Sequence, residues 1–292
     1  MSHSSQNTAG EASKPSTGHL AGEVFYRHWQ PAVEAKAVIL LVHGLGEHSG
    51  RYQSFADYFL PLGFAVVAPD HLGHGQSPGH RAHIDRFVDF FPPLDALRDK
   101  IASWYPSLPC FLVGHSMGGL ITARYLLDHQ QNFAAAALSG AALAVAEKPP
   151  APLLWLNALL SRLAPTLGIL QLDATQISRD PAVVQAYLDD PLVHDGKASA
   201  RLARELFQAM GELEQGRGGI TLPMLVMHGE KDAMAAAQGS ADFYRAIGSV
   251  DKTLRLYPEL YHEIFNEPER LEVLSDLATW LERQLAEHSA KS

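Results

Sequence analysis

The segment Cys110-Phe111-Leu112-Val113-Gly114-His115-Ser116-Met117-Gly118-Gly119 decides the expected fold. Its first four residues form an apolar run typical of a buried strand, and a helical pattern follows over Leu120–Leu127. The Gly-x-Ser-x-Gly motif between them fits a sharp strand–turn–helix connection that exposes a serine at the end of a sheet. A helix amino terminus behind Ser116 would also place backbone N–H groups near developing negative charge. We therefore predict that Ser116 is a nucleophile; the competing interpretation is a solvated serine in an ordinary βα turn.

Short apolar runs alternate with longer helical patterns on both sides of this motif. The expected strands are Val24–Trp29, Ala37–Val42, Phe64–Ala68, Phe111–Val113, Ala135–Leu138, Met224–Met227 and Thr253–Tyr257. The expected helices are Tyr52–Leu62, Phe87–Trp104, Met117–Asp128, Ala237–Ile247 and Glu269–Glu287. Several strands are apolar throughout, as is typical when helices cover both faces of a sheet. The alternation predicts an α/β fold with a mostly parallel, doubly wound sheet.

Two stretches break this alternation. Residues 1–19 lack periodicity and are rich in small and polar residues, so we expect a disordered tail before a folded domain over 20–292. Residues from about 147 to 215 contain no convincing strand and many leucines, which predicts a helical cap inserted into that domain. Four of its leucines fall at helical spacing, namely Leu153, Leu156, Leu160 and Leu163. We expect them to line a tunnel or face outward, unless they are simply core residues.

A serine nucleophile needs a base that an acid orients, and on this type of fold the acid precedes the histidine. Asp232 lies just past the strand Met224–Met227, where catalytic groups gather in open α/β sheets. Glu230 is the rival acid, but Asp232 lies deeper in the loop and its shorter side chain suits a fixed contact. His262 follows the strand Thr253–Tyr257 in the same way and is the predicted base. Other histidines after Ser116 are placed less suitably: His129, His194, His228 (too close to its own strand) and His288.

Acyl transfer also needs backbone donors that face the tetrahedral oxyanion. One donor is expected from Met117, the residue after the nucleophile. The strand Ala37–Val42 ends in His43-Gly44-Leu45-Gly46, and the glycines on either side of Leu45 would let its N–H turn inward. Leu45 is therefore the second predicted donor, with an ordinary glycine-rich turn as the alternative.

A histidine-rich loop beyond Asp70 calls for a separate interpretation. A zinc site can be imagined from its four histidines, which are His71, His74, His80 and His83. The loop has no cysteine and no helical histidine spacing, so we expect no metal there. We predict instead a loop whose conformation Asp70 and the glycines fix, and a local ion pair between Glu47 and Arg51.

Composition narrows the partners and the cellular location. The chain has 23 basic and 32 acidic residues and a net charge of −9, which argues against nucleic-acid binding and against electrostatic docking on anionic lipid. Its single cysteine, Cys110, excludes an intrachain disulfide. Neither a signal peptide nor an apolar run of membrane-spanning length is recognisable, so we expect a cytoplasmic protein. No cofactor is expected.

Four motifs in the expected order resemble the monoacylglycerol lipase family. They are HGLGEHSGRY at 43–52, DHLGHGQS at 70–77, GHSMGG at 114–119 and DDPLV at 189–193. The resemblance runs over nearly everything after the tail. It implies a single-domain α/β-hydrolase with a helical cap, which hydrolyses monoacylglycerols to fatty acid and glycerol through an acyl-enzyme.

The resemblance also assigns residues. It maps the catalytic triad onto Ser116, Asp232 and His262, and the oxyanion donors onto Leu45 and Met117. Tyr187 matches a cap tyrosine of the family, and we add His115 and His194 as candidate substrate contacts. An exposed apolar face of the cap would allow peripheral contact with membranes or micelles.

The substrate and even the reaction stay open at this stage. A lysophospholipase or a general carboxylesterase would use the same triad. An acyltransferase would replace water by an alcohol during deacylation. A binding protein on this fold would leave the triad unused.

Overall fold

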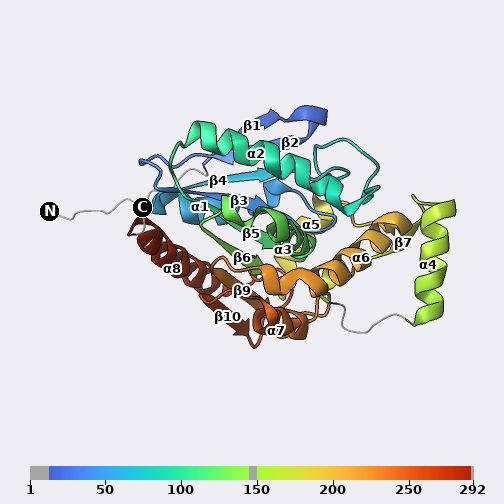
Figure 1. Cartoon of the computed structure of the whole chain (residues 1–292). Coiled ribbons are helices and arrows are strands. Elements are labelled where there is room, and N and C mark those ends of the chain that lie inside the picture. Colours follow the sequence, from blue (N-terminus) through green and yellow to red (C-terminus); the bar gives the residue numbers. More distant parts are fainter. Residues whose placement is uncertain (1–12, 145–149, 291–292) are drawn as a thin grey trace.

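A central sheet of eight strands organises the computed structural model, which describes residues 13–144 and 150–290 (Figure 1). Its strands are β1 Ser16–His19, β2 Phe25–Trp29, β3 Ala37–Val42, β4 Phe64–Pro69, β5 Cys110–His115, β6 Ala135–Ser139, β9 Met224–Gly229 and β10 Lys252–Tyr257. Their order is β1-β2-β4-β3-β5-β6-β9-β10. Only β2 runs against its neighbours β1 and β4, and the other pairings are parallel. The predicted α/β fold with a mostly parallel sheet is confirmed.

Helices cover both faces of this sheet (Figure 1). On one face lie α2 Phe91–Trp104, α3 Met117–His129 and α7 Ala237–Ala246, and on the other lie α1 Gln53–Phe59 and α8 Arg270–Ser289. Successive residues of β3 show the two layers: Leu40 belongs to the first apolar core and Leu41 to the second. Because side chains alternate across a strand, a strand buried on both faces must be apolar throughout.

The segment between β6 and β9 forms an added helical layer. It contains α4 Ala151–Leu163, β7 Gly168–Leu170, α5 Pro181–Asp189, β8 Ala198–Ser199 and α6 Ala200–Gly216. Helix α6 packs on α3, whereas α4 contacts α6 and stands away from the sheet (Figure 1). The expectation of no strand in this region is wrong, because β7 and β8 form a short antiparallel pair. Strands this short carry no readable alternation. The expected start of the insertion, at about residue 147, falls outside the described residues.

The expected disordered tail is also partly wrong. Ser16–His19 form β1, which pairs antiparallel with β2 from Ser16 opposite His28 to His19 opposite Phe25. Its side chains are largely exposed, so the strand is held by backbone hydrogen bonds that leave no hydrophobic pattern in the sequence. Residues 1–12 lie outside the described part of the chain.

Most leucines of α4 face outward. Trp155 is 68% exposed and Leu163 76%, while Asn157 and Ser161 are buried. The helix therefore presents its polar side to α6 and its apolar side to the surroundings, the reverse of an ordinary surface helix. Leu153 and Leu156 are 52% and 44% exposed and Leu160 is half-buried, so burial of the whole predicted leucine stripe in the core is excluded.

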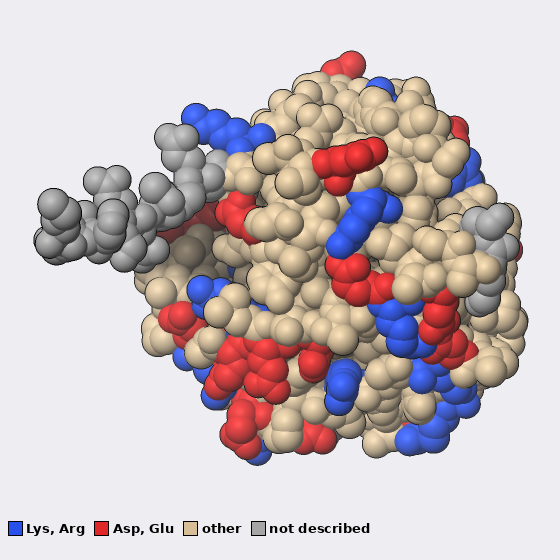
Figure 2. All heavy atoms as spheres, turned by 90° about the vertical axis from the view of Figure 1, so that its left-hand side faces the viewer, with Lys and Arg blue, Asp and Glu red and all other residues tan. Residues whose placement is uncertain are grey.

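Charged side chains are interspersed over the face seen in Figure 2, where Lys and Arg lie among Asp and Glu. Within residues 13–144 and 150–290, none of the helices is both long and apolar enough to cross a membrane.

The close approach of α3 to β3 generates the first prediction. A Cβ atom on Gly118 would lie 2.1 Å from the carbonyl oxygen of Val42 and 2.4 Å from that of His43. Neither backbone atom can move aside, so we expect Gly118→Ala to lower the free energy of unfolding by about 3 kcal/mol or more. Gly211 in α6 is the matched control, because its Cβ would meet nothing within 4 Å. Gly211→Ala should stabilise the protein by about 0.5–1 kcal/mol. Equal urea midpoints for the two variants would contradict this packing.

Candidate active site

Ser116 occupies the strained turn between β5 and α3. Its backbone angles, φ 55° and ψ −122°, lie in a region that L-residues rarely adopt. The turn is held by its own carbonyl oxygen, which accepts hydrogen bonds from Gly119 N–H at 2.9 Å and Ala142 N–H at 3.0 Å. Gly114 is required for close packing, since a Cβ there would lie 2.4 Å from Thr122 Oγ1. The turn thus presents the Ser116 hydroxyl at the carboxyl end of the sheet.

His262 lies on the loop after β10 and is buried. Its Nε2 is 2.8 Å from Ser116 Oγ, and its Nδ1 is 2.6 Å from Asp232 Oδ2. Since a carboxylate only accepts, Nδ1–H donates to Asp232 and Nε2 accepts from the Ser116 hydroxyl. The arrangement can therefore take the proton of Ser116.

Asp232, rather than Glu230, is the acid that contacts His262. Its Oδ1 accepts hydrogen bonds from Met234 N–H at 2.8 Å and Ala235 N–H at 2.9 Å, which fix the carboxylate. Glu230 is exposed, and its backbone N–H donates to Tyr257 in the neighbouring strand end.

The electrostatics of the pair favour charge on both groups. Burial alone would raise the pKa of Asp232, but hydrogen bonds from His228 and His262 hold it well below its ordinary value. Burial would lower the pKa of His262, but the bond to Asp232 and the negative charges of Asp232, Glu263 and Glu47 raise it above 6.5. A protonated His262 is thus stabilised at this position.

His228 supports the acid from its other side, a role that the sequence analysis missed. Its Nε2 is 3.0 Å from Asp232 Oδ2 and its Nδ1 is 2.7 Å from Ser240 Oγ. We set His228 aside because it lies too close to its strand to reach Ser116. The same position, four residues before Asp232, is what brings it against the acid.

The loop after β3 lies directly beside Ser116. A Cβ on Gly44 would be 3.1 Å from Ser116 Cβ. His43 Nε2 accepts the His71 backbone N–H at 2.9 Å, so His43 Nδ1–H donates to Gly44 O at 2.8 Å. The N–H and C=O of a trans peptide point in opposite directions. Because Gly44 O is held by His43, the N–H of Leu45 is fixed on the opposite side of that peptide.

Asp70 anchors the histidine-rich loop. Its Oδ1 accepts from Ser49 N–H at 2.9 Å and its Oδ2 from Gln76 N–H at 2.8 Å. Burial lowers the pKa of His71 to about 3 and that of His74 to about 4, so both rings are neutral. Among residues 13–144 and 150–290, no group of three His, Cys, Asp or Glu is arranged to hold a metal ion.

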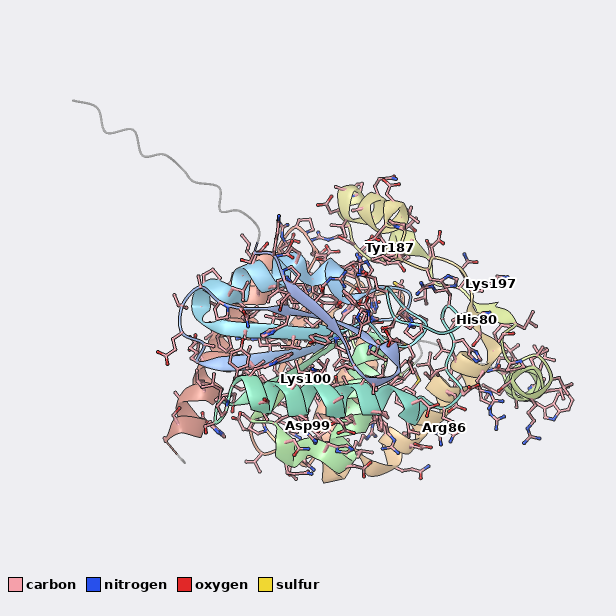
Figure 3. The ribbon with its side chains drawn as sticks, turned by 90° about the horizontal axis from the view of Figure 1, so that it is seen from above. His80, Arg86, Asp99, Lys100, Tyr187 and Lys197 are labelled. Carbon is pink, nitrogen blue, oxygen red and sulfur yellow. The ribbon has the colours of Figure 1, made fainter. Side chains whose placement is uncertain are left out.

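The three candidate substrate contacts separate into two places. Tyr187 and His194 line a small cavity of about 10 Å³ together with Leu45. Tyr187 projects from α5 (Figure 3). Its ring packs on the Arg51 guanidinium, 4.7 Å from the ring centre. His115 lies elsewhere: its ring is 4.9 Å from that of His262, and its Nδ1 is 3.0 Å from Ser139 O.

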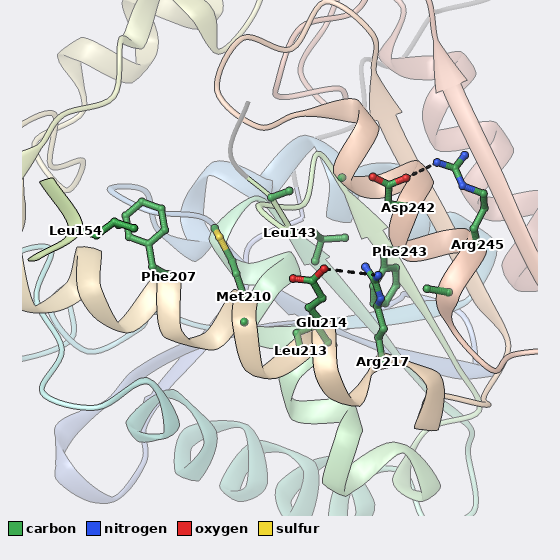
Figure 4. A pocket seen from close by; sticks show the side chains of 14 residues that line it. Leu143, Leu154, Phe207, Met210, Leu213, Glu214, Arg217, Asp242, Phe243 and Arg245 are labelled. Carbon is green, nitrogen blue, oxygen red and sulfur yellow. Dashed lines mark hydrogen bonds and ion pairs between the residues drawn. The ribbon is translucent and has the colours of Figure 1, made fainter. Parts of the chain in front are cut away.

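A much larger cavity of about 880 Å³ lies between α6 and α7 (Figure 4). Its wall is mainly apolar, with contributions from Leu143, Leu154, Phe207, Met210, Leu213 and Phe243. Glu214 with Arg217 and Asp242 with Arg245 form ion pairs at its rim. Leu143 directly follows Ala142, whose N–H donates to Ser116 O, so the wall begins close to the serine turn.

The short contact between His262 and Asp232 generates a spectroscopic prediction. A proton held in a short hydrogen bond between Nδ1 and a carboxylate resonates far downfield in the proton NMR spectrum. Because this hydrogen bond is buried, the proton should exchange slowly with water and its signal should be visible. The signal should vanish in Asp232→Asn and persist in Glu230→Gln. The opposite pattern would move the acid to Glu230.

Comparisons with known proteins show which hydrolases this chain is similar to. Residues 33–269 match the family described as "Serine aminopeptidase, S33". A "Monoacylglycerol lipase" of Mycolicibacterium smegmatis is 39% identical over 258 residues, which cover 88% of this chain and 92% of the relative. A crystal structure of Paleococcus ferrophilus monoacylglycerol lipase has a TM-score of 0.82 and 32% identity, covering 90% of this chain and 99% of that one.

A second solved structure is equally similar in fold. It is a soluble variant of monoglyceride lipase from Saccharomyces cerevisiae in complex with a substrate analog, with a TM-score of 0.82, 25% identity, and coverage of 97% and 99% of the two chains. The chain belongs to the serine aminopeptidase S33 family of hydrolases and, within it, to the monoacylglycerol lipase family.

Proposed function

We propose that this chain hydrolyses monoacylglycerols to a free fatty acid and glycerol. The observation that carries the proposal is the continuous hydrogen-bonded chain from Asp232 through His262 to Ser116, at the carboxyl end of the sheet. The names of the similar proteins support the substrate class.

In this proposal Ser116 Oγ attacks the ester carbonyl while His262 Nε2 takes its proton. The alcohol leaves with that proton from His262, and the acyl group stays on Ser116. A water molecule, deprotonated by His262 in turn, then releases the fatty acid. Asp232 holds the ring and stabilises the imidazolium that forms in both steps.

We assign the oxyanion donors to the N–H groups of Met117 and Leu45. Met117 is the first residue of α3, so its N–H has no partner inside the helix. The N–H of Leu45 lies opposite the Gly44 carbonyl, which His43 holds. Two preorganised donors of this kind stabilise the tetrahedral intermediate.

We infer that the acyl chain extends past Leu143 into the cavity between α6 and α7. The cavity volume of about 880 Å³ lies in the range typical of ligand sites, and its wall is mainly apolar. Each methylene buried there would add about 0.8 kcal/mol of binding free energy. The alcohol end would then face Tyr187 and His194 near Leu45.

Gly211 provides a test of the acyl site, since it lines the cavity and its Cβ would point into open space. Gly211→Phe should fill the cavity without disturbing the fold. We expect kcat/KM for monoolein to fall about 10-fold or more while that for a butyryl ester is retained. Gly219→Phe, at an exposed glycine whose Cβ also meets nothing, should change neither. Equal losses on both esters would exclude this path for the acyl chain.

One cavity of this size has little room for three acyl chains. We therefore expect efficient hydrolysis of monoolein, slower hydrolysis of diolein and almost none of triolein. Lysophosphatidylcholine, the substrate of the alternative lysophospholipase activity, should be poorer than monoolein, because Arg51, the guanidinium beside Tyr187 at the alcohol end, already pairs with Glu47 and Glu263. Equal rates on monoolein and triolein would contradict the single-chain site, and faster turnover of the lysolipid would assign the alternative activity.

Ser116→Ala tests the chemistry itself. Removing the nucleophile should lower kcat on monoolein by about 10⁴-fold or more with the fold intact. An active-serine phosphonate should label the wild type at Ser116 and leave the variant unlabelled. Turnover by the alanine variant at the wild-type rate would end the proposal.

We further propose that the apolar face of α4 contacts the lipid surface that supplies the substrate. Six large apolar residues of this helix are exposed: Leu153, Leu154, Trp155, Leu156, Leu159 and Leu163. The net charge of −9 leaves hydrophobic contact as the source of affinity. The free energy falls when exposed apolar side chains leave water and enter the boundary between lipid headgroups and acyl chains.

The double variant Trp155→Ser/Leu163→Ser should reduce cosedimentation with phosphatidylcholine vesicles about 10-fold or more, because each side chain loses its burial in lipid. Val250→Ser is the control, since Val250 is 99% exposed and lies before β10, outside the cap. Wild-type binding by the double variant would exclude α4 as the contact face.

A further inference from the structure

A buried ion cluster lies beside the triad, and none of its members transfers a proton or an acyl group in the reaction proposed above. Arg51 donates from Nη1 to Glu263 Oε1 at 2.5 Å and from Nη2 to Glu263 Oε2 at 2.8 Å. The same Nη1 donates to Glu47 Oε2 at 3.0 Å. All three side chains are nearly inaccessible to solvent, with 9%, 6% and 4% of Arg51, Glu263 and Glu47 exposed.

Each carboxylate of the cluster belongs to a loop that carries a proposed catalytic group. Glu47 Oε1 accepts the backbone N–H of Gly44 at 2.6 Å, in the loop that carries Leu45. Glu263 directly follows His262 in the chain. Arg51 and Glu263 are 212 positions apart, so the guanidinium is a direct bridge between two loops that the sheet brings together.

We propose that Arg51, held between Glu47 and Glu263, fixes the loop of His262 against the loop of Leu45, so that Glu263 is a positioning residue for the reaction. The inference rests on the proposed function, because it concerns the same hydrolysis. It assigns no contact with substrate to any of the three residues.

The energetics of buried ions favour a positioning role over simple stabilisation. Removing charges from water costs several kcal/mol per ion, and a buried pair often stabilises a fold no better than apolar residues of similar volume. A bidentate arginine–carboxylate contact, however, fixes distance and direction together. Such a contact suits a loop whose histidine must stay 2.8 Å from Ser116 Oγ.

The cluster also acts on His262 through charge. Two carboxylates and one guanidinium leave a net negative charge, and Glu263 and Glu47 both favour the protonated ring. The other groups that face His262 are Asp232, Ser116 and the neutral ring of His115. The cluster therefore stabilises the protonated form of His262 and also fixes the position of its ring.

The cap is tied to the same bridge. The ring of Tyr187 packs on Arg51, and the backbone N–H of Glu263 donates to Ile177 O at 2.7 Å. Arg179 adds an ion pair with the buried Glu267, 2.7 Å between Nε and Oε2. The segment that leads into α5 thus rests on the loop of His262, and α5 itself contacts the bridge through Tyr187.

Glu263→Gln tests the proposal, with kcat, KM and their pH dependence measured on p-nitrophenyl butyrate. Glutamine keeps the shape but removes the charge and one strong contact to Arg51. We expect kcat to fall about 10- to 100-fold with little change in KM, as for small misplacements of a reacting group. The acid limb of the pH profile should move to lower pH, because the imidazolium loses a negative neighbour. Glu259→Gln is the control, at an exposed glutamate on the same loop.

Arg51→Lys separates geometry from charge. Lysine keeps the positive charge but cannot make the bidentate contact, so kcat should fall while the acid limb stays in place. This variant also decides the matter if Glu263→Gln does not fold, which thermal melting will show. Wild-type kcat in either folded variant would overturn the bridge.

The two proposals fail in different ways. If the wild type neither hydrolyses p-nitrophenyl butyrate nor reacts with a phosphonate at Ser116, the proposed function fails and the catalytic role of the bridge fails with it. If the wild type is active and Glu263→Gln matches it in kcat and pH profile, the positioning role of the bridge is contradicted and the proposed function stands.

Discussion

The hydrogen bond between Asp232 and His262 is the contact on which the site depends. It joins loops after two neighbouring strands, β9 and β10, and it turns the ring of His262 so that Nε2 reaches Ser116 in the turn after β5. Other contacts around the site hold the residues that this hydrogen bond connects. Backbone N–H groups and His228 fix the carboxylate, and the strained turn fixes the serine. The parallel sheet matters because it brings the carboxyl ends of its strands to one edge.

A shell of buried polar groups then determines where the neighbouring loops lie. His43 accepts the N–H of His71 and donates to Gly44, an arrangement open only to a neutral ring. Burial holds the pKa of His43 well below its ordinary value, so this orientation persists in mildly acidic solution. Asp70 and the cluster around Arg51 connect the same loops to β2 and to the loop of His262. Buried polar networks whose members are all hydrogen-bonded specify one arrangement of a site.

The parts predicted from the sequence are those that hydrophobic patterns and chain order determine. Apolar runs marked the strands buried on both faces, and the serine turn with its flanking elements located Ser116. Strand β1 was not predicted, because backbone hydrogen bonds to β2 hold it and its sequence has no hydrophobic pattern. The role of His228 was not predicted, because it depends on a contact with a carboxylate four residues away. The interaction of Arg51 with Glu263 was not predicted, because 212 positions separate the two residues in the chain. The outward leucines of α4 have the spacing of a core helix, and only the fold shows which side is covered.

The pH dependence of kcat/KM in the wild type tests the account most directly. His262 must be neutral to take the proton of Ser116, and its pKa in the folded protein is raised above 6.5. Activity toward a soluble ester should therefore be full at alkaline pH and should be lost as the pH falls through a value above 6.5. Asp232, whose pKa is held low, stays ionised over this range. A rate that remained flat down to about pH 4, well below the ordinary histidine pKa, would contradict a histidine base held by Asp232.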